Sequence, residues 1–210
     1  MVATGSTNSQ MTREELIALA PEVLVVVDRS GSMGGHWNKM AESVEAFAGI
    51  ARNYDPNGIS VILFNDSAQF MDQVPEDKVR SIFAENEPNG GTNMQAAFNK
   101  IQEVVSANVA AGKSTLVLFF GDGEPTPNAE SQKKAIAQII IAMTQSMTND
   151  NQLAISLNQV GEDAAAAKFF QALDDELQGL GAKFDVVNRS SWTEWKDASP
   201  TAVMLAAYND

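Results

Sequence analysis

The apolar positions of this 210-residue chain fall into two patterns that follow one another along the sequence. Continuous runs such as "VLVVV" at 23–27 and "TLVLFF" at 115–120 are typical of strands buried on both faces. Between such runs, apolar residues recur every three or four positions, as in 38–51, which indicates amphipathic helices. Strands that alternate with helices predict an α/β fold, with a doubly wound, mostly parallel sheet covered by helices on both faces.

Six strands and seven helices are expected along the chain. The strands are predicted at 23–27, 59–65, 68–74, 115–120, 152–160 and 184–188. The helices are predicted at 13–19, 38–51, 76–84, 93–109, 162–178 and 200–208, with a further one whose inner face holds Ile136, Ile139, Ile140, Met143 and Met147. Two helix starts have local signals, the capping-box spacing of Thr12 and Glu15 and the pair Ser199 and Pro200.

Composition narrows the class of protein. One domain is expected over residues 12–210, because α/β units of this length usually form a single core, and residues 1–11 are predicted to be a flexible polar tail. The net charge of −13 repels nucleic acid and anionic membranes, which excludes both as expected partners. The chain has no cysteine and no apolar run of roughly 18 residues, the length that a membrane span needs. We therefore expect a cytoplasmic protein.

Candidate chemistry lies where two buried strands end. Asp28 and Asp122 follow the runs at 23–27 and 115–120, and the carboxyl ends of parallel strands share one edge of the sheet, where ligands bind. Asp28, Ser30 and Ser32 are spaced by two, so in an extended segment their side chains point the same way. Carboxylate and hydroxyl oxygens together suit a hard divalent cation.

Three motifs together resemble those of von Willebrand factor A (VWA) domains, whose metal-ion-dependent adhesion site (MIDAS) has the pattern Asp-x-Ser-x-Ser. They are "DRSGSM" from Asp28, "GGTN" around Thr92 and "GDGEP" around Asp122. The resemblance implies five metal-site residues, Asp28, Ser30, Ser32, Thr92 and Asp122. It also implies Mg²⁺ as the cofactor, with Mn²⁺ or Ca²⁺ as alternatives, and a Rossmann-like sheet of order 3-2-1-4-5-6 with one antiparallel edge strand. The sequence departs from the family at Gly121, where a threonine is usual.

The resemblance implies a protein-interaction module and not an enzyme. Neutral hydroxyl ligands would leave the cation much of its positive charge, so that an Asp or Glu carboxylate of a partner protein can complete its coordination. Intracellular relatives occur with ATPases, with chelatases or in stress systems, which gives the expected class of partner.

Two other functions stay open at this point. The first is a metal-dependent hydrolase of phosphate esters, which the loops support poorly because they offer no nucleophile, no base beyond His36 and no cation except Arg29. The second is a structural subunit without metal.

Competing motifs fit less well. An EF-hand counted from Asp28 would place Met33 and Lys39 where its glycine and bidentate glutamate belong. The segment "GKST" at 112–115 lacks the earlier glycine of a phosphate loop, since Ala107 stands there, and it is interpreted as a helix end.

Four single residues near the motifs have structural interpretations. His36 is expected at a helix start or on the rim of the site. Glu124, followed by Pro125, is expected to shape the turn rather than reach the metal. Trp192 and Trp195 are expected to pack in the core.

Overall fold

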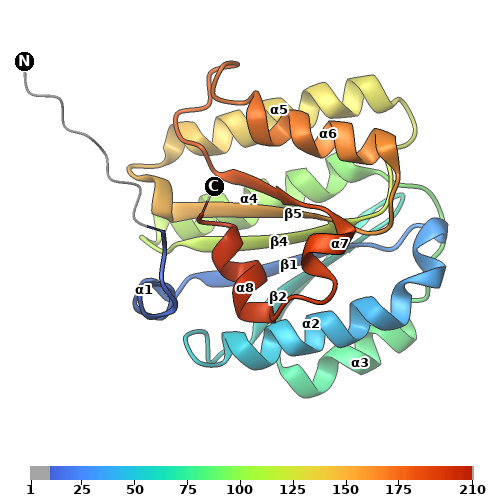
Figure 1. The fold of residues 1–210 in the computed structure, drawn as a ribbon, viewed down its shortest axis with the longest axis horizontal. Coiled ribbons are helices and arrows are strands. Elements are labelled where there is room, and N and C mark those ends of the chain that lie inside the picture. Colours follow the sequence, from blue (N-terminus) through green and yellow to red (C-terminus); the bar gives the residue numbers. More distant parts are fainter. Residues whose placement is uncertain (1–9, 210) are drawn as a thin grey trace, which may run out of the picture.

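The computed structural model describes residues 10–209, which form a six-stranded sheet between two layers of helices (Figure 1). The strands are β1 (Glu22–Asp28), β2 (Ile59–Phe64), β3 (Ala68–Val74), β4 (Thr115–Gly121), β5 (Leu153–Gln159) and β6 (Val187–Ser190). Their order is β3-β2-β1-β4-β5-β6, and all neighbours are parallel except the antiparallel pair β2 and β3. The predicted fold class and strand order are confirmed.

The helices cover both faces of the sheet. They are α1 (Arg13–Leu19), α2 (Trp37–Ala51), α3 (Glu76–Glu85), α4 (Met94–Ala110), α5 (Ala129–Ser146), α6 (Ala164–Asp175), α7 (Trp192–Trp195) and α8 (Pro200–Ala206), with short 3₁₀ helices η1 (Gly31–Gly35) and η2 (Asp150–Gln152). Helices α4, α5 and α6 cover one face, and α1, α2, α3, α7 and α8 cover the other (Figure 1). No described helix has the length and apolarity that a membrane crossing requires.

The core consists of two apolar layers, one on each side of the sheet. Along β1, Val23, Val25 and Val27 join the layer beneath α2, whereas Leu24 and Val26 join the layer beneath α4 and α5. Strand β4 is buried along its whole length. The continuous apolar runs of both strands follow from this position in the middle of the sheet, because side chains on both faces are covered.

The signals for helix ends are confirmed at three places. The Thr12 hydroxyl accepts a hydrogen bond from the backbone N–H of Glu15 at 3.2 Å, and the Glu15 carboxylate accepts one from the N–H of Thr12 at 2.8 Å. The Ser199 hydroxyl caps α8 by accepting from the N–H of Ala202 at 3.2 Å. At the end of α4, Gly112 has a φ of +72°, as expected for a helix end and not a phosphate loop.

The sixth strand is displaced from its predicted position. The expected strand at 184–188 is Val187–Ser190 in the structure, so Phe184 and Asp185 lie outside it. The backbone N–H of Lys183 donates to the Thr144 hydroxyl at 2.9 Å, and its ammonium donates to the carbonyl of Met147 at 2.6 Å. These bonds hold the chain against the end of α5, so pairing with β5 begins only afterwards.

Two further differences concern the termini and the segment before α8. The predicted tail at 1–11 lies mostly outside the described residues. Within them, the backbone N–H of Met11 donates to Asn209 Oδ1, and Asn209 Nδ2 donates to the carbonyl of Met11. The short helix α7 was not predicted, although Ser191 and Glu194 form a capping box before and within it. Its Trp195 is buried and donates to the carbonyl of Gln159 at 2.6 Å, which confirms core packing for this tryptophan.

Candidate metal centre

The candidate centre lies where the neighbouring strands β1 and β4 end. Asp28 is the last residue of β1, and Gly121, which precedes Asp122, is the last residue of β4. A Cβ atom at Gly121 would lie 3.1 Å from the Phe119 ring and 3.7 Å from Asp28. The close contact is with Phe119 of the same strand, whereas the contact with Asp28 would be an ordinary van der Waals contact.

A continuous chain of hydrogen bonds joins four of the five predicted site residues. The backbone N–H of Ser30 donates to Asp28 Oδ1 at 2.7 Å, and the hydroxyls of Ser30 and Ser32 are 3.0 Å apart. The Ser32 hydroxyl donates to Asp122 Oδ1 at 3.0 Å. Because Ser32 has a single hydroxyl proton and gives it to Asp122, Ser30 is the donor in the serine pair. The two loops thus bring Asp28 and Asp122 to one place, as predicted.

The two carboxyl groups are poorly compensated. Asp28 is fully buried, and within the described residues its Oδ2 atom has no hydrogen-bond partner. Burial raises the pKa of Asp28 to about 7 against the hydrogen bonds from Ser30, and the charge of Asp122 adds to the rise. Burial also raises the pKa of Asp122, although the hydrogen bond from Ser32 opposes it. A buried, unpaired carboxylate oxygen beside two hydroxyls fits the oxygen ligands that a divalent cation takes.

Thr92 lies in the loop between α3 and α4 and is buried. This loop contacts both aspartate loops: Gly31 N–H donates to the carbonyl of Gly90 at 3.2 Å, and Thr92 exchanges two hydrogen bonds with Thr126. In that exchange Thr92 N–H donates to the Thr126 hydroxyl at 3.0 Å, and Thr126 N–H donates to the Thr92 carbonyl at 2.8 Å. Among the described residues, no hydrogen bond joins the Thr92 side chain to the other four predicted residues.

Three residues that hold the Thr92 loop were not found from the sequence. Besides Thr126, they are Asn65 and Asp66, which follow β2. Asn65 Nδ2 donates to the carbonyl of Asn89 at 3.1 Å, and Asp66 Oδ1 accepts from the N–H of Gly91 at 3.1 Å. Gly90 has a φ of +76°, and a Cβ atom there would lie only 2.5 Å from Asp66 Oδ2, so the position requires glycine. The double glycine before Thr92 was the signal for this close approach.

Three residues around the site make contacts of their own. His36 precedes α2 and its ring lies 5.1 Å from that of Trp192, as expected for a residue at a helix start. The Glu124 carboxylate forms an ion pair with Lys133 of α5, a contact that was not predicted. Arg29 donates to Asn86 Oδ1 at 3.2 Å.

The donor set differs from that of many metal sites. Within residues 10–209 there is no group of three His, Cys, Asp or Glu side chains placed to hold a metal ion. The candidate centre has two carboxyl groups, and its remaining oxygens are hydroxyls. Any cation here would therefore keep more of its positive charge than in a site of three carboxylates.

The sheet order and the two loops at its carboxyl edge define the protein as a VWA domain. A model of VWA domains found in the TerF C terminus matches residues 20–155, so the chain belongs to this vWA-TerF-like family. No curated protein matches the sequence.

Solved structures of low sequence identity share the fold. The VWA domain of SpRpn10 has a TM-score of 0.58 and 12% identity, over 87% of this chain and 93% of that chain. The manganese-loaded TRAP protein of Plasmodium vivax has a TM-score of 0.58 and 16% identity, over 89% and 72%. The D319A mutant of the PilB minor pilin of Streptococcus sanguinis has a TM-score of 0.57 and 12% identity; the match covers 89% of this chain but only 59% of the pilin chain.

Proposed function

We propose that this VWA domain is a protein-interaction module that depends on a divalent cation and binds a carboxylate of its partner. The interaction role is supported by membership in the VWA class and by the similarity to the pilin and to TRAP. The metal dependence is supported by the side chains at the ends of β1 and β4. The TRAP structure with the same fold was obtained loaded with manganese, which agrees with a site of this kind.

One observation carries the metal proposal. Asp28 Oδ2 is buried without a hydrogen-bond partner in the described residues, at one end of the chain of groups that leads through Ser30 and Ser32 to Asp122. An unpaired buried carboxylate is costly, and a cation is a group that would relieve that cost. Asp28, Ser30, Ser32, Thr92 and Asp122 would hold Mg²⁺ or Mn²⁺, with Ca²⁺ as an alternative.

The bound cation would supply positive charge for an anionic ligand. The protein's own part is to hold the two loops together and to offer neutral hydroxyls between the two carboxyl groups. The preference for a carboxylate over a neutral ligand follows from this charge. The proposal assigns no catalytic step to the domain, and it keeps a cytoplasmic ATPase or stress-system component as the class of partner.

Metal titration tests the proposal. Calorimetric titration with Mg²⁺ and Mn²⁺ should show one site in the wild type, and Asp122→Asn should weaken it because one of the two negative charges is lost. The matched control is Asp77→Asn, an exposed acid in the first turn of α3, which should bind metal like the wild type. Equal affinity in all three proteins, or no binding to the wild type, would contradict the proposal.

A partner-binding experiment tests the second part of the proposal, that the domain binds a carboxylate of its partner through the cation. Proteins captured by the wild-type domain from a lysate should be released by a chelator and by a short peptide that contains aspartate. Capture that persists in chelator would remove the metal from the mechanism, and metal-dependent turnover of a phosphate ester would favour the hydrolase instead.

A further inference from the structure

The sheet has two edge strands, β3 and β6, and β3 is the longer, with seven residues against four. Its regular pairing with β2 runs from Ala68 to Met71, after which the register shifts and Gln73 has a φ of +51°. An edge strand presents backbone N–H and C=O groups on its outer side. Among the described residues no further strand pairs with this side, so the stretch 68–72 can accept one.

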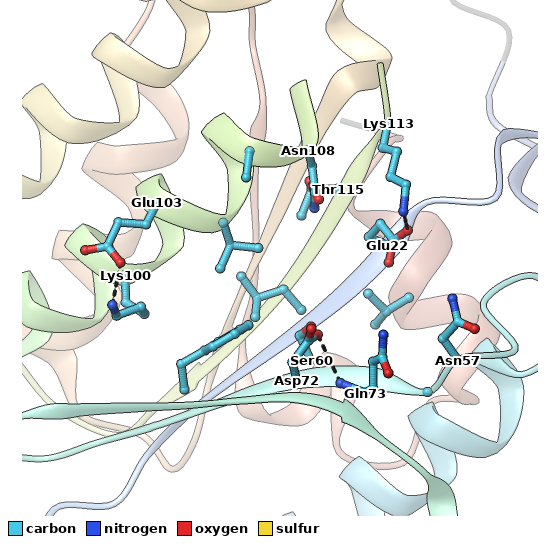
Figure 2. A pocket seen from close by; sticks show the side chains of 16 residues that line it. Glu22, Asn57, Ser60, Asp72, Gln73, Lys100, Glu103, Asn108, Lys113 and Thr115 are labelled. Atoms are coloured by element: carbon cyan, nitrogen blue, oxygen red, sulfur yellow. Dashed lines mark hydrogen bonds and ion pairs between the residues drawn. The ribbon is translucent and has the colours of Figure 1, made fainter. Parts of the chain in front are cut away.

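Phe70, in the middle of this stretch, is an exposed aromatic residue. It is 38% exposed, and within the described residues Leu180 is the only other large apolar side chain classed as exposed. Phe70 pairs with Ile62, which belongs to the layer beneath α4, so both side chains point to that face of the sheet. A cavity of about 370 Å³ remains there between β3 and α4, lined by Phe70 and by Val104 of α4 (Figure 2). A strand added to β3 would place every second side chain towards this cavity.

Two of the three acids that line the cavity are paired with lysines. Lys113 pairs with Glu22 at 2.6 Å. Lys100 pairs with Glu103, at some distance from the first pair (Figure 2). The remaining acid, Asp72 of β3, forms no ion pair with a described residue. The cavity therefore has one more acid than base, and the unpaired acid lies on the edge strand.

Asp72 keeps one carboxylate oxygen available for a cation. Its Oδ1 atom accepts hydrogen bonds from the Ser60 hydroxyl at 2.8 Å and from the N–H of Gln73 at 3.0 Å, whereas no described residue donates to Oδ2. The pKa of Lys113 is raised chiefly by Glu22, and Asp72 contributes least to that rise. Asp72 and Phe70 are two residues apart on one strand, so they share a face. A lysine or arginine side chain can cover the ring with its stem and bring its charge to the carboxylate.

The segments that flank β3 add negative charge. Residues 65–77, which contain β3 and the start of α3, hold four acids and no lysine or arginine. Among these four acids only Glu76 forms an ion pair with a described residue, Arg52, at 2.9 Å. The outer side of β3 is thus negative, in a chain whose net charge is −13. Such a surface attracts a basic segment and repels a second copy of this chain.

We propose that β3 binds an extended, basic segment of a partner protein, which adds a strand to the sheet beside 68–72. Backbone hydrogen bonds to β3 would hold the segment, and a lysine or arginine side chain would lie over Phe70 with its charge at Asp72. In this mode of recognition the main chain supplies affinity and alternate side chains supply specificity. The cavity includes Glu22 and Thr115, the first residues of β1 and β4, whereas the candidate metal centre lies where these strands end. Binding at β3 therefore requires no metal.

A displayed library of random decapeptides tests the proposal. Selection on the wild-type domain should enrich peptides in which lysine or arginine alternates with β-branched or aromatic residues. An enriched peptide is then labelled with a fluorophore, and its affinity is measured by polarisation in Mg²⁺ and in chelator.

N-methylation of the peptide distinguishes an added strand from a purely electrostatic contact. Two versions of the peptide carry methyl groups on alternate sets of backbone nitrogens. An added strand donates only every second N–H to its neighbour, so one version should lose binding and the other should keep it.

Variants assign the binding to β3. Phe70→Ser should weaken it about tenfold, because the apolar ring that the peptide covers is lost. Leu180→Ser removes the other exposed large apolar side chain, beyond the end of α6, and should leave the affinity unchanged. Asp72→Asn retains the acceptor for Ser60 but should weaken binding about threefold at low salt, as expected for an exposed ion pair. Its matched control is Asp150→Asn, an exposed acid in η2, which should have no effect.

Losses confined to the two β3 variants, with equal affinity in Mg²⁺ and chelator, would support the proposal. It would be overturned if no peptide is enriched, if the enriched peptides lack lysine and arginine, or if the β3 variants bind them as tightly as the wild type. Binding that survives both methylation patterns would show that no strand is added, which also overturns it.

Two further results would assign the binding elsewhere and overturn the proposal. If sedimentation equilibrium shows a wild-type dimer that Phe70→Ser dissociates, the occupant of β3 is a second copy of the chain. If peptide binding disappears in chelator, the peptides occupy the metal centre, and the function proposed for that centre is unaffected.

Discussion

The central sheet has a buried aspartate at each of its two edges, the one where β1 begins and the one where β1 ends. The charges of these two aspartates are compensated differently. At the edge where β1 begins, burial and the charge of Glu22 raise the pKa of Asp55, while hydrogen bonds from the backbone of Val23 and Asn57 and the charge of Lys113 lower it. Its Oδ2 atom, like that of Asp28, has no hydrogen-bond partner in the described residues. At the edge where β1 ends, Asp28 has only Ser30 as a donor, and its charged neighbour is a second acid, Asp122. Both aspartates are thus buried with a raised pKa, but only Asp55 has a cation, Lys113, among the charges that act on it.

The largest expected effect tests this difference with one substitution at each edge. Asp28→Asn should weaken Mg²⁺ binding by about 100-fold or more, because changes even to groups behind metal ligands cost 10- to 100-fold. Asp55→Asn also neutralises a buried acid, but it should leave the affinity unchanged. Calorimetry on both variants makes the comparison, and circular dichroism confirms that both are folded. Equal losses would mean that burial of an acid, rather than its place in the loop, controls metal binding.

The pH dependence of metal binding sharpens the comparison. The carboxyl of Asp28 has a pKa of about 7 without metal and must lose its proton to bind a cation, so affinity should be constant above pH 7. Below pH 7 it should fall by about tenfold per unit, since each further unit protonates ten times more of this group. Titrations between pH 5.5 and pH 8 measure the slope. An affinity that is flat across this range would contradict the role of Asp28.

The stability of the metal-free domain should change with pH in the direction opposite to that of the metal affinity. Because the pKa of Asp28 is raised in the folded state, the folded domain holds this proton more tightly than the unfolded chain. The free energy of unfolding therefore falls as the pH rises from about 4 to about 7. Asp28→Asn removes this charge and should raise the free energy of unfolding by about 1–3 kcal/mol at pH 8 in chelator. Urea unfolding with and without Mg²⁺ measures the free energy of unfolding of both proteins. The difference between the variant and the wild type should shrink below pH 4. A variant less stable than the wild type at pH 8 would show that the carboxylate is well compensated without metal.

The smallest expected effect concerns the loop that carries Thr92. Thr126→Val keeps the shape of the side chain but removes the hydroxyl that accepts a hydrogen bond from Thr92 N–H. The loss of one such bond is worth about 1 kcal/mol, so metal affinity should fall by about fivefold if Thr92 is a ligand. The same calorimetric titration measures this change. An unchanged affinity, with the variant folded, would separate Thr92 from the metal centre.

The central strands of the sheet were predicted from the sequence more accurately than the edge strand β6. Strands β1 and β4 are buried on both faces, and their continuous apolar runs are visible without any knowledge of partners. The four-residue strand β6 begins after its predicted position, because Lys183 is held by Thr144 and Met147, which are far away in the sequence. Contacts of this kind leave no periodic pattern.

The same reason limits prediction of the site. The positions of Asp28, Ser30, Ser32 and Asp122 follow from strand ends and a two-residue spacing, and the structure joins these residues by hydrogen bonds. The roles of Asn65, Asp66 and Thr126 arise from backbone atoms of another loop, so neither their type nor their spacing identifies them. The ion pair of Glu124 was not predicted, because its partner Lys133 lies nine residues further along the chain, in α5.

A crystal structure of the domain grown with Mn²⁺ tests the central claim most directly, because the anomalous signal of manganese locates the ion independently of the protein atoms. The account predicts one strong peak between Asp28 and Asp122, in contact with the hydroxyls of Ser30 and Ser32 directly or through water. A crystal soaked in saturating Mn²⁺ that shows no peak there, or shows its peak at Asp55 instead, would contradict it.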